Sequence, residues 1–517
     1  MPHTDIVVVG AGHNGLVAAI LAAAAGRRVT VFDAARKPGG ATVGEVLFDG
    51  HPARLSRYSY LVSLFPAQLA ERLGIRLVLA SRAVSSYTPV RRGSRETGLL
   101  VERRPGTVTE QSFLDVTGSG QDYTEWQRLY GELGAAAGAV APGLLGPLPR
   151  RAAVRAAVTA AAGSTIWDDI VEQPLGQAIT RRFRDDTVRG VVATDGLIGT
   201  HTSVFSQSLL ANRCFLYHVI GRGTGEWLVP VGGMGALTDA LLARARELGV
   251  DIRTESVVTA ADEDADGVEV SVHADVDATW HAEVLLAAVA PGVVDGWLGR
   301  ATVRPIGAQL KVNMLLDRLP TLKSGLDPAT AFAGTTHLEE GFEQLEAAYR
   351  RSAAGDLPTP LPGEVYCHSL TDPSILGGRP GATLTLFGLH TPVGLFDADN
   401  AGRRAEAADA ALAALQTQLA EPLLDCVSRS ESGELCLDVA SPLDLESDLR
   451  MPGGNIFHGD LTWPWLDDDE PAETAAERHG VAVAGSRRIL LAGAGSRRGG
   501  GVSGLGGAAA VDALLAG

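Results

Sequence analysis

The stretch from Asp5 to Asp33 constrains the fold more than any other part of the chain. It opens with β-branched residues, Ile6 to Val9, which have the composition of a buried parallel strand. The glycine-rich segment 10–15 (GAGHNG) follows, then an apolar helical pattern over 16–25, and a second strand-like run that ends on Asp33. A G-x-G-x-x-G spacing between a strand and a helix, with an acid after the next strand, is typical of a dinucleotide-binding βαβ unit. The sequence therefore predicts a dinucleotide site at the start of the chain.

Each glycine of this motif has a physical task here. Gly10 allows the tight turn, Gly12 lets the backbone approach a pyrophosphate, and Gly15 permits close packing of helix and strand. The helix N-terminus presents free N–H groups and a partial positive charge to phosphates. Asp33 is expected to accept hydrogen bonds from ribose hydroxyls.

A second glycine pair follows soon after the acid, at Gly39 and Gly40. Small residues here would let the backbone run beside an extended cofactor, as in flavin enzymes of the glutathione-reductase type, although a simple turn explains the pair equally well. The segment 55–65 (LSRYSYLVSLF) mixes aromatic and hydroxyl residues and is a candidate to meet a flavin ring. The segment 232–235 is glycine-rich but lacks the motif's spacing, so we expect no tightly held NAD(P)H.

Composition limits the class of protein. The chain has 517 residues, 45% of them apolar, and a formal net charge of −17, which describes a globular protein with a sizeable core and argues against nucleic acid or anionic membrane as a partner. Four cysteines without a C-x-x-C spacing argue against a dithiol redox centre and favour a reducing compartment. No apolar run is long enough for a transmembrane segment, and the first strand leaves no room for a signal peptide, so the expected location is cytoplasmic.

The sequence after this first unit predicts a sheet, a helical cap and a closing nucleotide-binding unit. Residues from about 120 to 190 have a helical composition and are expected to form a cap on the core. The end of the chain again reads strand (488–491), glycine-rich loop (496–507) and helix (508–515). In two-part flavin folds such a terminal unit brings backbone N–H groups to the ribityl chain and the flavin ring.

Four passages, spread in order over nearly the whole chain, carry a resemblance to a known family. They are VVVGAGHNGLVAA, WLVPVGGMGALTDAL, GGNIFHGDLT and LLAGAGSRRGGGVSGLGGAAA. With them the chain resembles the phytoene-desaturase-like branch of the FAD-dependent amine-oxidase superfamily, and within it bacterial relatives of the pyridine nucleotide-disulphide oxidoreductase domain-containing protein 2 type. The resemblance implies an α/β fold of two parts, a Rossmann-like FAD-binding domain and a discontinuous mixed α+β substrate domain with a helical cap.

The resemblance also implies domain ranges and a cofactor site. The FAD domain would comprise 1–70, 225–298 and 485–517, and the substrate domain 71–224 and 299–484. FAD would be bound without a covalent link. The residues expected to hold it are Gly10, Ala11, Gly12, Asn14, Gly15, Asp33, Ala34, Arg36, Gly40, Ala41, Val258, Gly493, Gly495, Gly501, Val502 and Ser503.

The chain departs from the family pattern at three places. Asp33 stands where members usually have Glu, and Ala35 stands where an Arg is common, with Arg36 one place later. The closing loop has Ser496-Arg497-Arg498 where Thr-His-Pro is common, which would place two cations near the flavin end. FAD binding is expected to survive these changes, but the inherited activity is in doubt.

The leading expectation is an FAD-dependent oxidoreductase that desaturates or dehydrogenates an apolar or amphipathic small molecule, in the setting of bacterial secondary metabolism. Hydride would pass to flavin N5, and oxygen or a quinone would take the electrons. Proton-handling candidates are His458, His218 and Tyr60, each with a purely structural role as the alternative.

Other assignments stay open at this point. His13 is expected beside the cofactor, and Lys311 in either the site or a surface ion pair. Alternative functions are an amine oxidase that forms an imine with oxygen as acceptor, a reductase or isomerase, and a non-catalytic flavoprotein that acts as a binding subunit. No histidine spacing fits a metal site, and no nucleophile motif fits a hydrolase. The substrate and the oligomeric state cannot be read from the sequence.

Overall fold

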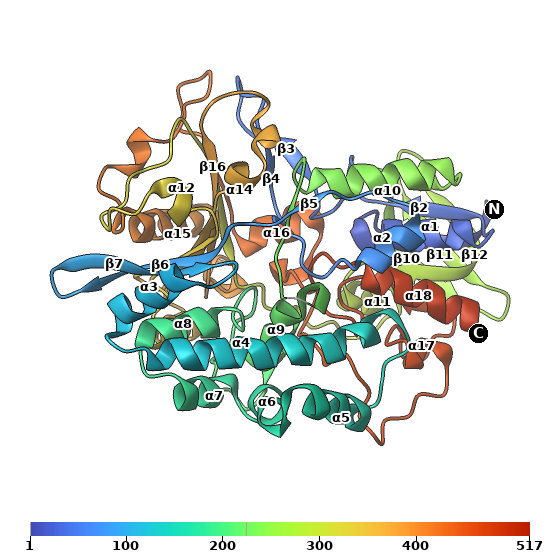
Figure 1. Ribbon diagram of the computed structural model, residues 1–517. Helices are drawn as coiled ribbons and strands as arrows, with labels where there is room; N and C mark the ends of the chain where they lie inside the picture. The colour runs from blue at the N-terminus through green and yellow to red at the C-terminus, as the bar shows by residue number, and fades with distance from the viewer. Residues whose placement is uncertain (1, 224) are drawn as a thin grey trace.

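A computed structural model describes residues 2–223 and 225–517 and contains two seven-stranded sheets (Figure 1). The first sheet has the order β10-β11-β12-β1-β2-β9, with β18 beside the end of β12. Its strands are β1 (His3–Val9), β2 (Val29–Phe32), β9 (Asp251–Arg253), β10 (Val257–Glu263), β11 (Val268–His273), β12 (Ala278–Ala287) and β18 (Ile489–Leu491).

The centre of this sheet is parallel and buried on both faces. β1 runs parallel to β2 and β12, β2 to β9, and β12 to β18. Val7 and Val8 of β1 are fully buried, as β-branched residues of a doubly covered parallel strand should be. Helices α1 (His13–Ala24), α10 (Gly235–Glu247) and α18 (Leu505–Ala516) pack together over one face. The predicted strand–loop–helix–strand unit and the closing strand and helix are thus confirmed, and their strands belong to one sheet.

The second sheet has the order β17-β13-β16-β15-β14-β6-β7 and is antiparallel except where β14 meets β6. Its strands are β6 (Val84–Arg92), β7 (Arg95–Glu102), β13 (Leu310–Leu316), β14 (Thr335–Leu338), β15 (Gly363–Tyr366), β16 (Ala382–Gly388) and β17 (Leu437–Ala440). Two short ribbons pair β3 (Gly44–Val46) with β4 (Arg54–Ser56), and β5 (Leu79–Ala80) with β8 (Val229–Pro230).

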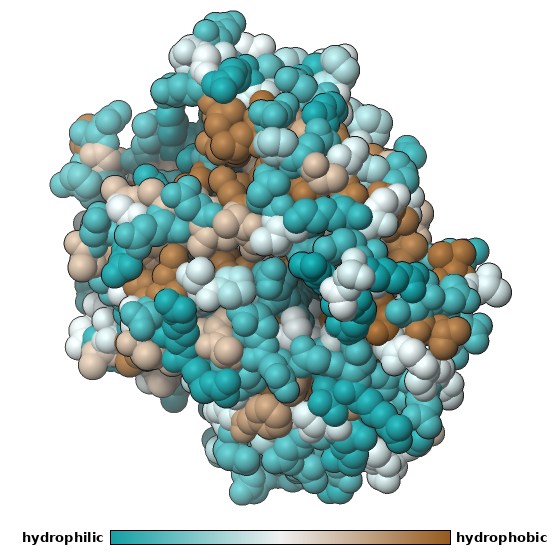
Figure 2. Space-filling view, turned by 90° about the vertical axis from the view of Figure 1, so that its left-hand side faces the viewer, coloured by the Kyte–Doolittle hydropathy of each residue, from teal (hydrophilic) through white to brown (hydrophobic). Residues whose placement is uncertain are grey.

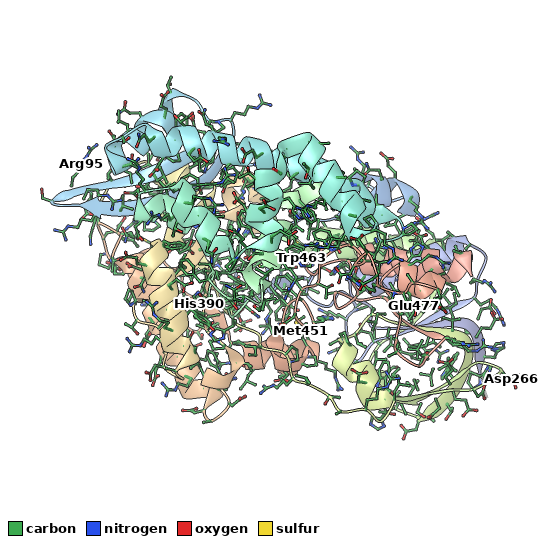
Figure 3. All side chains as sticks on the ribbon, turned by 90° about the horizontal axis from the view of Figure 1, so that it is seen from below. Arg95, Asp266, His390, Met451, Trp463 and Glu477 are labelled. Carbon is green, nitrogen blue, oxygen red and sulfur yellow. The ribbon has the colours of Figure 1, made fainter. Side chains whose placement is uncertain are left out.

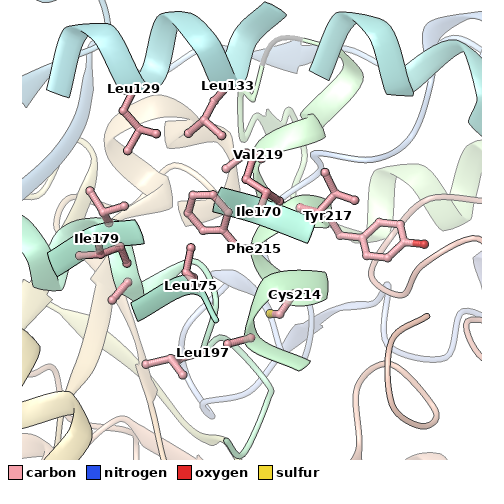
Figure 4. Close-up of a cluster of buried hydrophobic side chains, with 14 of the residues drawn as sticks. Leu129, Leu133, Ile170, Leu175, Ile179, Leu197, Cys214, Phe215, Tyr217 and Val219 are labelled. Carbon is pink, nitrogen blue, oxygen red and sulfur yellow. The ribbon is translucent and has the colours of Figure 1, made fainter. Parts of the chain in front are cut away.

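A layer of helices covers the underside of the molecule in Figure 1, as the helical composition near 120–190 predicted. They are α3 (Thr107–Thr117), α4 (Gln121–Val140), α5 (Arg151–Ala162), α6 (Ser164–Trp167), α7 (Leu175–Arg182), α8 (Asp186–Thr194) and α9 (Leu210–Ile220). Figure 4 shows Leu129 and Leu133 of α4 above Phe215 and Val219 of α9, within a large buried apolar cluster. Since helices without such a shared core are marginal in water, this cluster is what fixes the layer.

The structure has further α-helices outside this layer and outside the group α1, α10 and α18. They are α2 (Ala67–Leu73), α11 (Pro291–Trp297), α12 (Pro328–Ala331), α13 (Phe342–Ala353), α14 (His368–Thr371), α15 (Asn400–Gln416), α16 (Pro442–Leu449) and α17 (Ala475–Arg478). Among the described residues, no helix is both long and apolar enough to cross a membrane.

The two sheets lie at opposite ends of the molecule. Figure 3 shows Arg95, on the second sheet, at one end and Asp266, in the turn between β10 and β11, at the other, with Met451 between them. On the face in Figure 2, hydrophobic residues occur in separate patches among hydrophilic ones. A cavity lined by residues of both sheets lies between them.

Candidate functional site

A cavity of about 790 Å³ extends between the first sheet and the second. Its volume lies within the range typical of small-molecule and cofactor sites. Gly12 and Asp33 line it from the first sheet's loops, Lys311 and Phe387 from the second sheet, and Gly501 from the closing loop. One continuous space thus connects the beginning of the chain with its end.

The glycine loop between β1 and α1 is shaped as the motif requires. Gly10 has φ +96°, a conformation that favours glycine, and a Cβ on Gly15 would lie 1.9 Å from the Gly10 carbonyl oxygen. Gly12, by contrast, has φ −70° and ψ 174°, which any residue adopts, and a Cβ there would meet only the Cα of Gly40, at 4.0 Å. Gly12 is therefore dispensable for the loop's conformation, and its missing side chain leaves room in the cavity.

The N-terminus of α1 faces the same space without a side-chain cap. Gly12 is its N-cap residue and no acid lies in its first turn, so the helix's own residues leave the N–H groups of that turn and its positive dipole end uncompensated. His13 and Asn14 of this turn line the cavity. This is an arrangement suited to an anion such as a pyrophosphate.

Asp33 is held in place by backbone donors. Its Oδ2 accepts from the Ala11 N–H at 2.6 Å, and its Oδ1 accepts from the Ala35 N–H at 2.7 Å. Burial raises the pKa of this carboxyl, and the two backbone hydrogen bonds oppose the rise. The acid is thus oriented beside the glycine loop, where a ribose hydroxyl can donate to it.

The second glycine pair lies directly against the first loop. The Gly39 N–H donates to the Ala11 carbonyl at 2.9 Å, Gly12 and Gly39 form a parallel bridge, and a Cβ on Gly40 would lie 3.3 Å from the Gly12 Cα. The sequence left two interpretations of Gly39 and Gly40, a simple turn or a close approach of the backbone beside an extended ligand. The contact with the first glycine loop agrees with the close approach.

The closing loop completes the cavity from the other side. A ring nitrogen of His13 lies 3.2 Å from the Gly501 carbonyl oxygen, and Val502 lines the cavity next to it. Burial lowers the pKa of His13 to about 4, so this ring is neutral near pH 7 and adds no charge beside the glycine loop.

Several buried polar atoms in the cavity walls have no hydrogen-bond partner among the described residues. Asn14 Oδ1, Ser63 Oγ and His458 Nδ1 are buried, make no hydrogen bond among the described residues, and belong to residues that line the cavity. Because such atoms are ordinarily satisfied, a bound polar ligand is the natural partner. Together with the glycine cradle, this fits a flavin dinucleotide.

The structure brings most of the predicted cofactor residues to this cavity. Those that line it are Gly10, Gly12, Asn14, Gly15, Asp33, Ala34, Gly40, Ala41, Val258, Gly501 and Val502. Ala11 acts through its backbone on Asp33, while Arg36 is exposed and does not line the cavity. Gly493, Gly495 and Ser503 also do not line it; a Cβ on Gly493 would lie 3.1 Å from the Ala288 carbonyl carbon, so this position serves packing.

The three predicted proton-handling residues, His458, His218 and Tyr60, all line the cavity. His218 Nδ1 lies 2.8 Å from the Cys214 carbonyl oxygen, and the ring stacks on Trp227 at 4.9 Å between centroids. Donation from Nδ1 to that carbonyl assigns Nε2 as an acceptor. Burial lowers the pKa of both His218 and His458 to about 4 and raises the pKa of Tyr60 well above its usual value.

The structure also contains a second cavity, of about 510 Å³, that the sequence did not predict. Tyr60, Leu61, Ile198, His218 and Trp227 line both cavities and so form the wall between them. Its other walls carry charged and aromatic side chains from α4, the end of α8, and the second sheet. Asp195, His337 and Glu364 belong to this set, and no short motif joins them because they lie in three separate elements.

Lys311 lies in the site, which is one of its two expected places, whereas the closing-loop arginines differ from expectation. Lys311 is buried and donates to the carbonyls of Ser56 and Tyr58 at 2.7 and 2.5 Å, so it is neither a surface ion pair nor bonded to a carboxylate. Arg497 pairs with Glu470 at 2.6 Å, and Arg498 donates to backbone carbonyls. Neither arginine lines the cavity of about 790 Å³, so the predicted cations near its closing-loop end are engaged elsewhere.

The segment 445–452, at the end of α16, lines the cavity as well and was not predicted. Tyr58 donates to Asp448 at 2.9 Å, which joins this segment to the region after the second glycine pair. The segment carries no motif, and the only signal was its position just before the GGNIFHG passage.

Comparison with known sequences gives a consistent result. The family described as an NAD(P)-binding Rossmann-like domain matches residues 8–70. The uncharacterized protein Rv0897c of Mycobacterium tuberculosis is 44% identical over 526 residues, covering 99% of this chain and 97% of the relative. Pyridine nucleotide-disulfide oxidoreductase domain-containing protein 2 of Mus musculus is 28% identical over 557 residues, covering 98% and 92%. A hydroxyneurosporene desaturase of Rhodobacter capsulatus is 68% identical over 37 residues, 7% of this chain and 8% of the desaturase.

Solved structures share the fold over its whole extent. An oxidoreductase from Methanosarcina mazei superposes with a TM-score of 0.58 at 14% identity, covering 99% of this chain and 100% of the other. Cyclohexylamine oxidase from Brevibacterium oxydans gives 0.54 at 16% identity, covering 100% and 98%. These likenesses establish the fold and confirm its predicted two-part class. The chain therefore belongs to the same family as mycobacterial Rv0897c, is homologous to pyridine nucleotide-disulfide oxidoreductase domain-containing protein 2, and shares the fold of cyclohexylamine oxidase.

Proposed function

We propose that this protein binds FAD non-covalently in the cavity of about 790 Å³ and dehydrogenates or desaturates an amphipathic small molecule. The observation that supports FAD is the continuity of this cavity from Asp33 through the two glycine loops to Gly501 and Val502. A nicotinamide dinucleotide site needs the first loop but not the closing unit. We further propose the domain ranges 1–70, 225–298 and 485–517 for the cofactor, and 71–224 and 299–484 for the substrate.

The residues present fit such a cofactor from end to end. Val258 would meet the adenine, Asp33 the ribose hydroxyls, and the first turn of α1 the pyrophosphate. Backbone groups at Gly501 and Val502 would lie beside the flavin end. Bound there, FAD would supply the hydride acceptor that the protein's own side chains lack.

The chain's contribution is orientation and the exclusion of water. Tyr60 packs in an aromatic group with Tyr366 at 4.8 Å and Phe387 at 5.7 Å between ring centroids, and Lys311 Nζ lies 5.1 Å from its ring centroid. This group would hold an apolar part of the substrate against the cofactor cavity. Walls that exclude water would prevent side reactions while the bound cofactor accepts a hydride.

Proton handling falls to the acceptors that line the cavity. His218 is neutral near pH 7 and has an acceptor at Nε2, while its Nδ1 is engaged with the Cys214 carbonyl. His458 has a buried, unpartnered Nδ1 in the same cavity. Either ring can take a proton from a substrate atom adjacent to the C–H bond that loses hydride. Oxygen or a quinone is the proposed final electron acceptor.

Anaerobic photoreduction followed by addition of oxygen, or of a quinone, tests this proposal. We expect the purified protein to show flavin absorbance bands that bleach on reduction and recover when the acceptor is added. Protein that carries no flavin, or whose flavin never reduces, contradicts the proposal and favours a non-catalytic binding subunit. Rapid peroxide release with simple amines would instead favour an amine oxidase.

A further inference from the structure

Arg450 enters the cavity of about 790 Å³ from the part of the chain that carries the second sheet. It is the C-cap residue of α16, the helix that follows β17, and the segment 445–452 lines the cavity together with Asp33 and the first turn of α1. Figure 3 places Met451, the next residue, between the two ends of the molecule. Arg450 is therefore placed to contact a ligand that the loops of the first sheet hold.

The charged groups that line this cavity leave one cation available to a ligand. Among the described residues, the acids in its walls are Asp33, Glu446 and Asp448, and the cations are Lys311 and Arg450. Lys311 already donates to two backbone carbonyls, and burial lowers its pKa well below the usual value. The positive charge that a ligand can meet is thus that of Arg450.

The acids that line the cavity beside Arg450 have other partners. Glu446 pairs with Arg304, and Asp448 accepts from the Tyr58 hydroxyl at 2.9 Å. Arg450 itself is exposed and makes no hydrogen bond or ion pair with a described residue. Its guanidinium is therefore free to bind an anion.

Arg450 lies near Asp33 without being bonded to it. Burial raises the pKa of Asp33, and the Ala11 and Ala35 N–H groups and the charge of Arg450 each lower it. Both oxygens of Asp33 accept from those backbone N–H groups instead of from the guanidinium. The arginine is thus close to the acid assigned to the ribose, where the phosphates of a dinucleotide adjoin.

The backbone at Arg450 is one that an arginine adopts at a cost. Its φ of 51° and ψ of 40° lie in the left-handed region, which glycine or asparagine ordinarily occupies at the end of a helix. A cation gains from the helix dipole anywhere in the last turn, so the dipole does not require arginine at this position. Side chains kept at strained positions often serve a ligand, which agrees with the place of Arg450 in the cavity wall.

Hydrogen bonds hold the segment in place on both sides of Arg450. Before it, Ser441 and Asp444 form a capping box at the start of α16. After it, the Gly454 N–H donates to the Met451 carbonyl at 2.8 Å. Because the backbone is already ordered, less entropy is lost when the arginine binds a ligand.

Each phosphate of a dinucleotide carries a negative charge, and the N-terminus of α1 offsets only about half an elementary charge. We propose that Arg450 binds the pyrophosphate of the cofactor, so that a residue from the second-sheet part of the chain completes the phosphate site begun by α1. A guanidinium suits this task because its paired N–H groups match phosphate oxygens. This inference rests on the proposed function, since it adds a residue to the same cofactor site.

Release of FAD from the purified holoprotein tests this contact. Dilution series followed by flavin fluorescence give the dissociation constant in about 0.05 M and about 0.5 M NaCl. We expect Arg450→Gln, which needs the same backbone conformation, to weaken FAD binding about tenfold in the lower salt. The dissociation constant of this variant should also depend less on salt, because a charged contact is lost. Arg450→Lys, which keeps the charge, should restore part of the affinity.

Two control variants separate a phosphate contact from general effects of charge and folding. Arg36→Gln removes an exposed arginine outside the cavity and makes the same change in net charge, so FAD affinity should stay within about twofold. Arg450→Gly suits the left-handed backbone, so it should weaken FAD binding as Arg450→Gln does, with an unchanged circular dichroism spectrum.

Each outcome separates this inference from the proposed function. Unchanged FAD binding in Arg450→Gln, or an equal loss in Arg36→Gln, overturns the phosphate contact while the flavin function stands. If Arg450→Gln does not fold, Arg450→Gly and Arg450→Lys decide. Protein that purifies without flavin rejects the proposed function, and calorimetry with ADP and adenosine then tests the contact. Tighter binding of ADP that is lost in Arg450→Gly sustains it, whereas equal or absent binding of the two probes overturns it.

Discussion

Gly12 is a position where the fold does not require glycine but the proposed cofactor does. Its φ of −70° suits alanine, and a Cβ there would meet only the Gly40 Cα, at 4.0 Å. Gly12→Ala should therefore fold normally, while the added methyl group occupies the space proposed for the pyrophosphate. We expect flavin content after purification to fall at least tenfold, with an unchanged circular dichroism spectrum.

A matched control is available in the same loop. A Cβ on Gly15 would lie 1.9 Å from the Gly10 carbonyl oxygen, so Gly15→Ala should lose both flavin and stability. If Gly12→Ala retains flavin at the level of the unaltered protein, the assignment of this loop to the pyrophosphate is wrong.

At the scale of elements, Arg498 joins the closing loop to the helical layer. It is fully buried, has a pKa lowered to about 10 by burial, and donates to the carbonyls of Gly143, Leu144, Gly146 and His479. Three of these carbonyls lie at or just after the 3₁₀ helix Ala141–Leu145. A cation at this end satisfies orphan carbonyls and suits the local dipole.

Replacing this arginine should destabilise the protein without removing the flavin. Arg498→Met leaves several buried carbonyls without donors, which should lower the free energy of unfolding by about 3 kcal/mol. Urea unfolding followed by tryptophan fluorescence measures the change. Arg497→Met, which removes the partly exposed pair with Glu470, is the control and should cost less than about 1 kcal/mol. Equal effects of the two substitutions would show that the carbonyl contacts of Arg498 do not stabilise the loop.

The elements also show what the sequence could and could not predict. The unit Asp5–Asp33 was predictable because its signals are local: β-branched run, glycine spacing, apolar helix and acid. The contacts of Arg497 and Arg498 could not be predicted from the sequence. The carbonyl groups that accept hydrogen bonds from Arg498 lie in and just after a helix about 350 residues earlier in the chain.

The second cavity was unpredictable for a related reason. Asp195 caps the end of α8, while His337 and Glu364 lie opposite each other on β14 and β15, so the three residues meet only in the folded chain. Isolated acids in a sequence are ordinarily solvated surface residues. The roles of His458, His218 and Tyr60 stay predictions, although all three line the proposed flavin cavity.

At the scale of the whole molecule, buried neutral histidines should set the acid limit of stability. Six have a pKa lowered to about 3 or 4 by burial: His13, His201, His218, His368, His390 and His458. In the unfolded chain they bind protons below pH 6.5, whereas the folded chain excludes those protons until about pH 4, so stability falls as the pH falls through this window. The raised pKa values of Asp195 and Glu364 act in the opposite sense but involve fewer groups.

Thermal unfolding at pH 7 and pH 5 tests this balance. We expect a lower Tm at pH 5. His390 has φ +54° and no hydrogen bond to either ring nitrogen among the described residues, so His390→Asn, which tolerates that backbone conformation, should reduce the pH dependence. A Tm that is equal or higher at pH 5 would mean that the buried carboxyl groups dominate.

The central claim is that one cavity, built from both ends of the chain, holds a flavin dinucleotide. Release of the chromophore from the purified protein by denaturation, with chromatographic and mass identification, tests it most directly. We expect FAD, free of any covalent link, at close to one molecule per chain. Release of FMN, of a nicotinamide dinucleotide, or of no chromophore from folded protein supplied with FAD would contradict it.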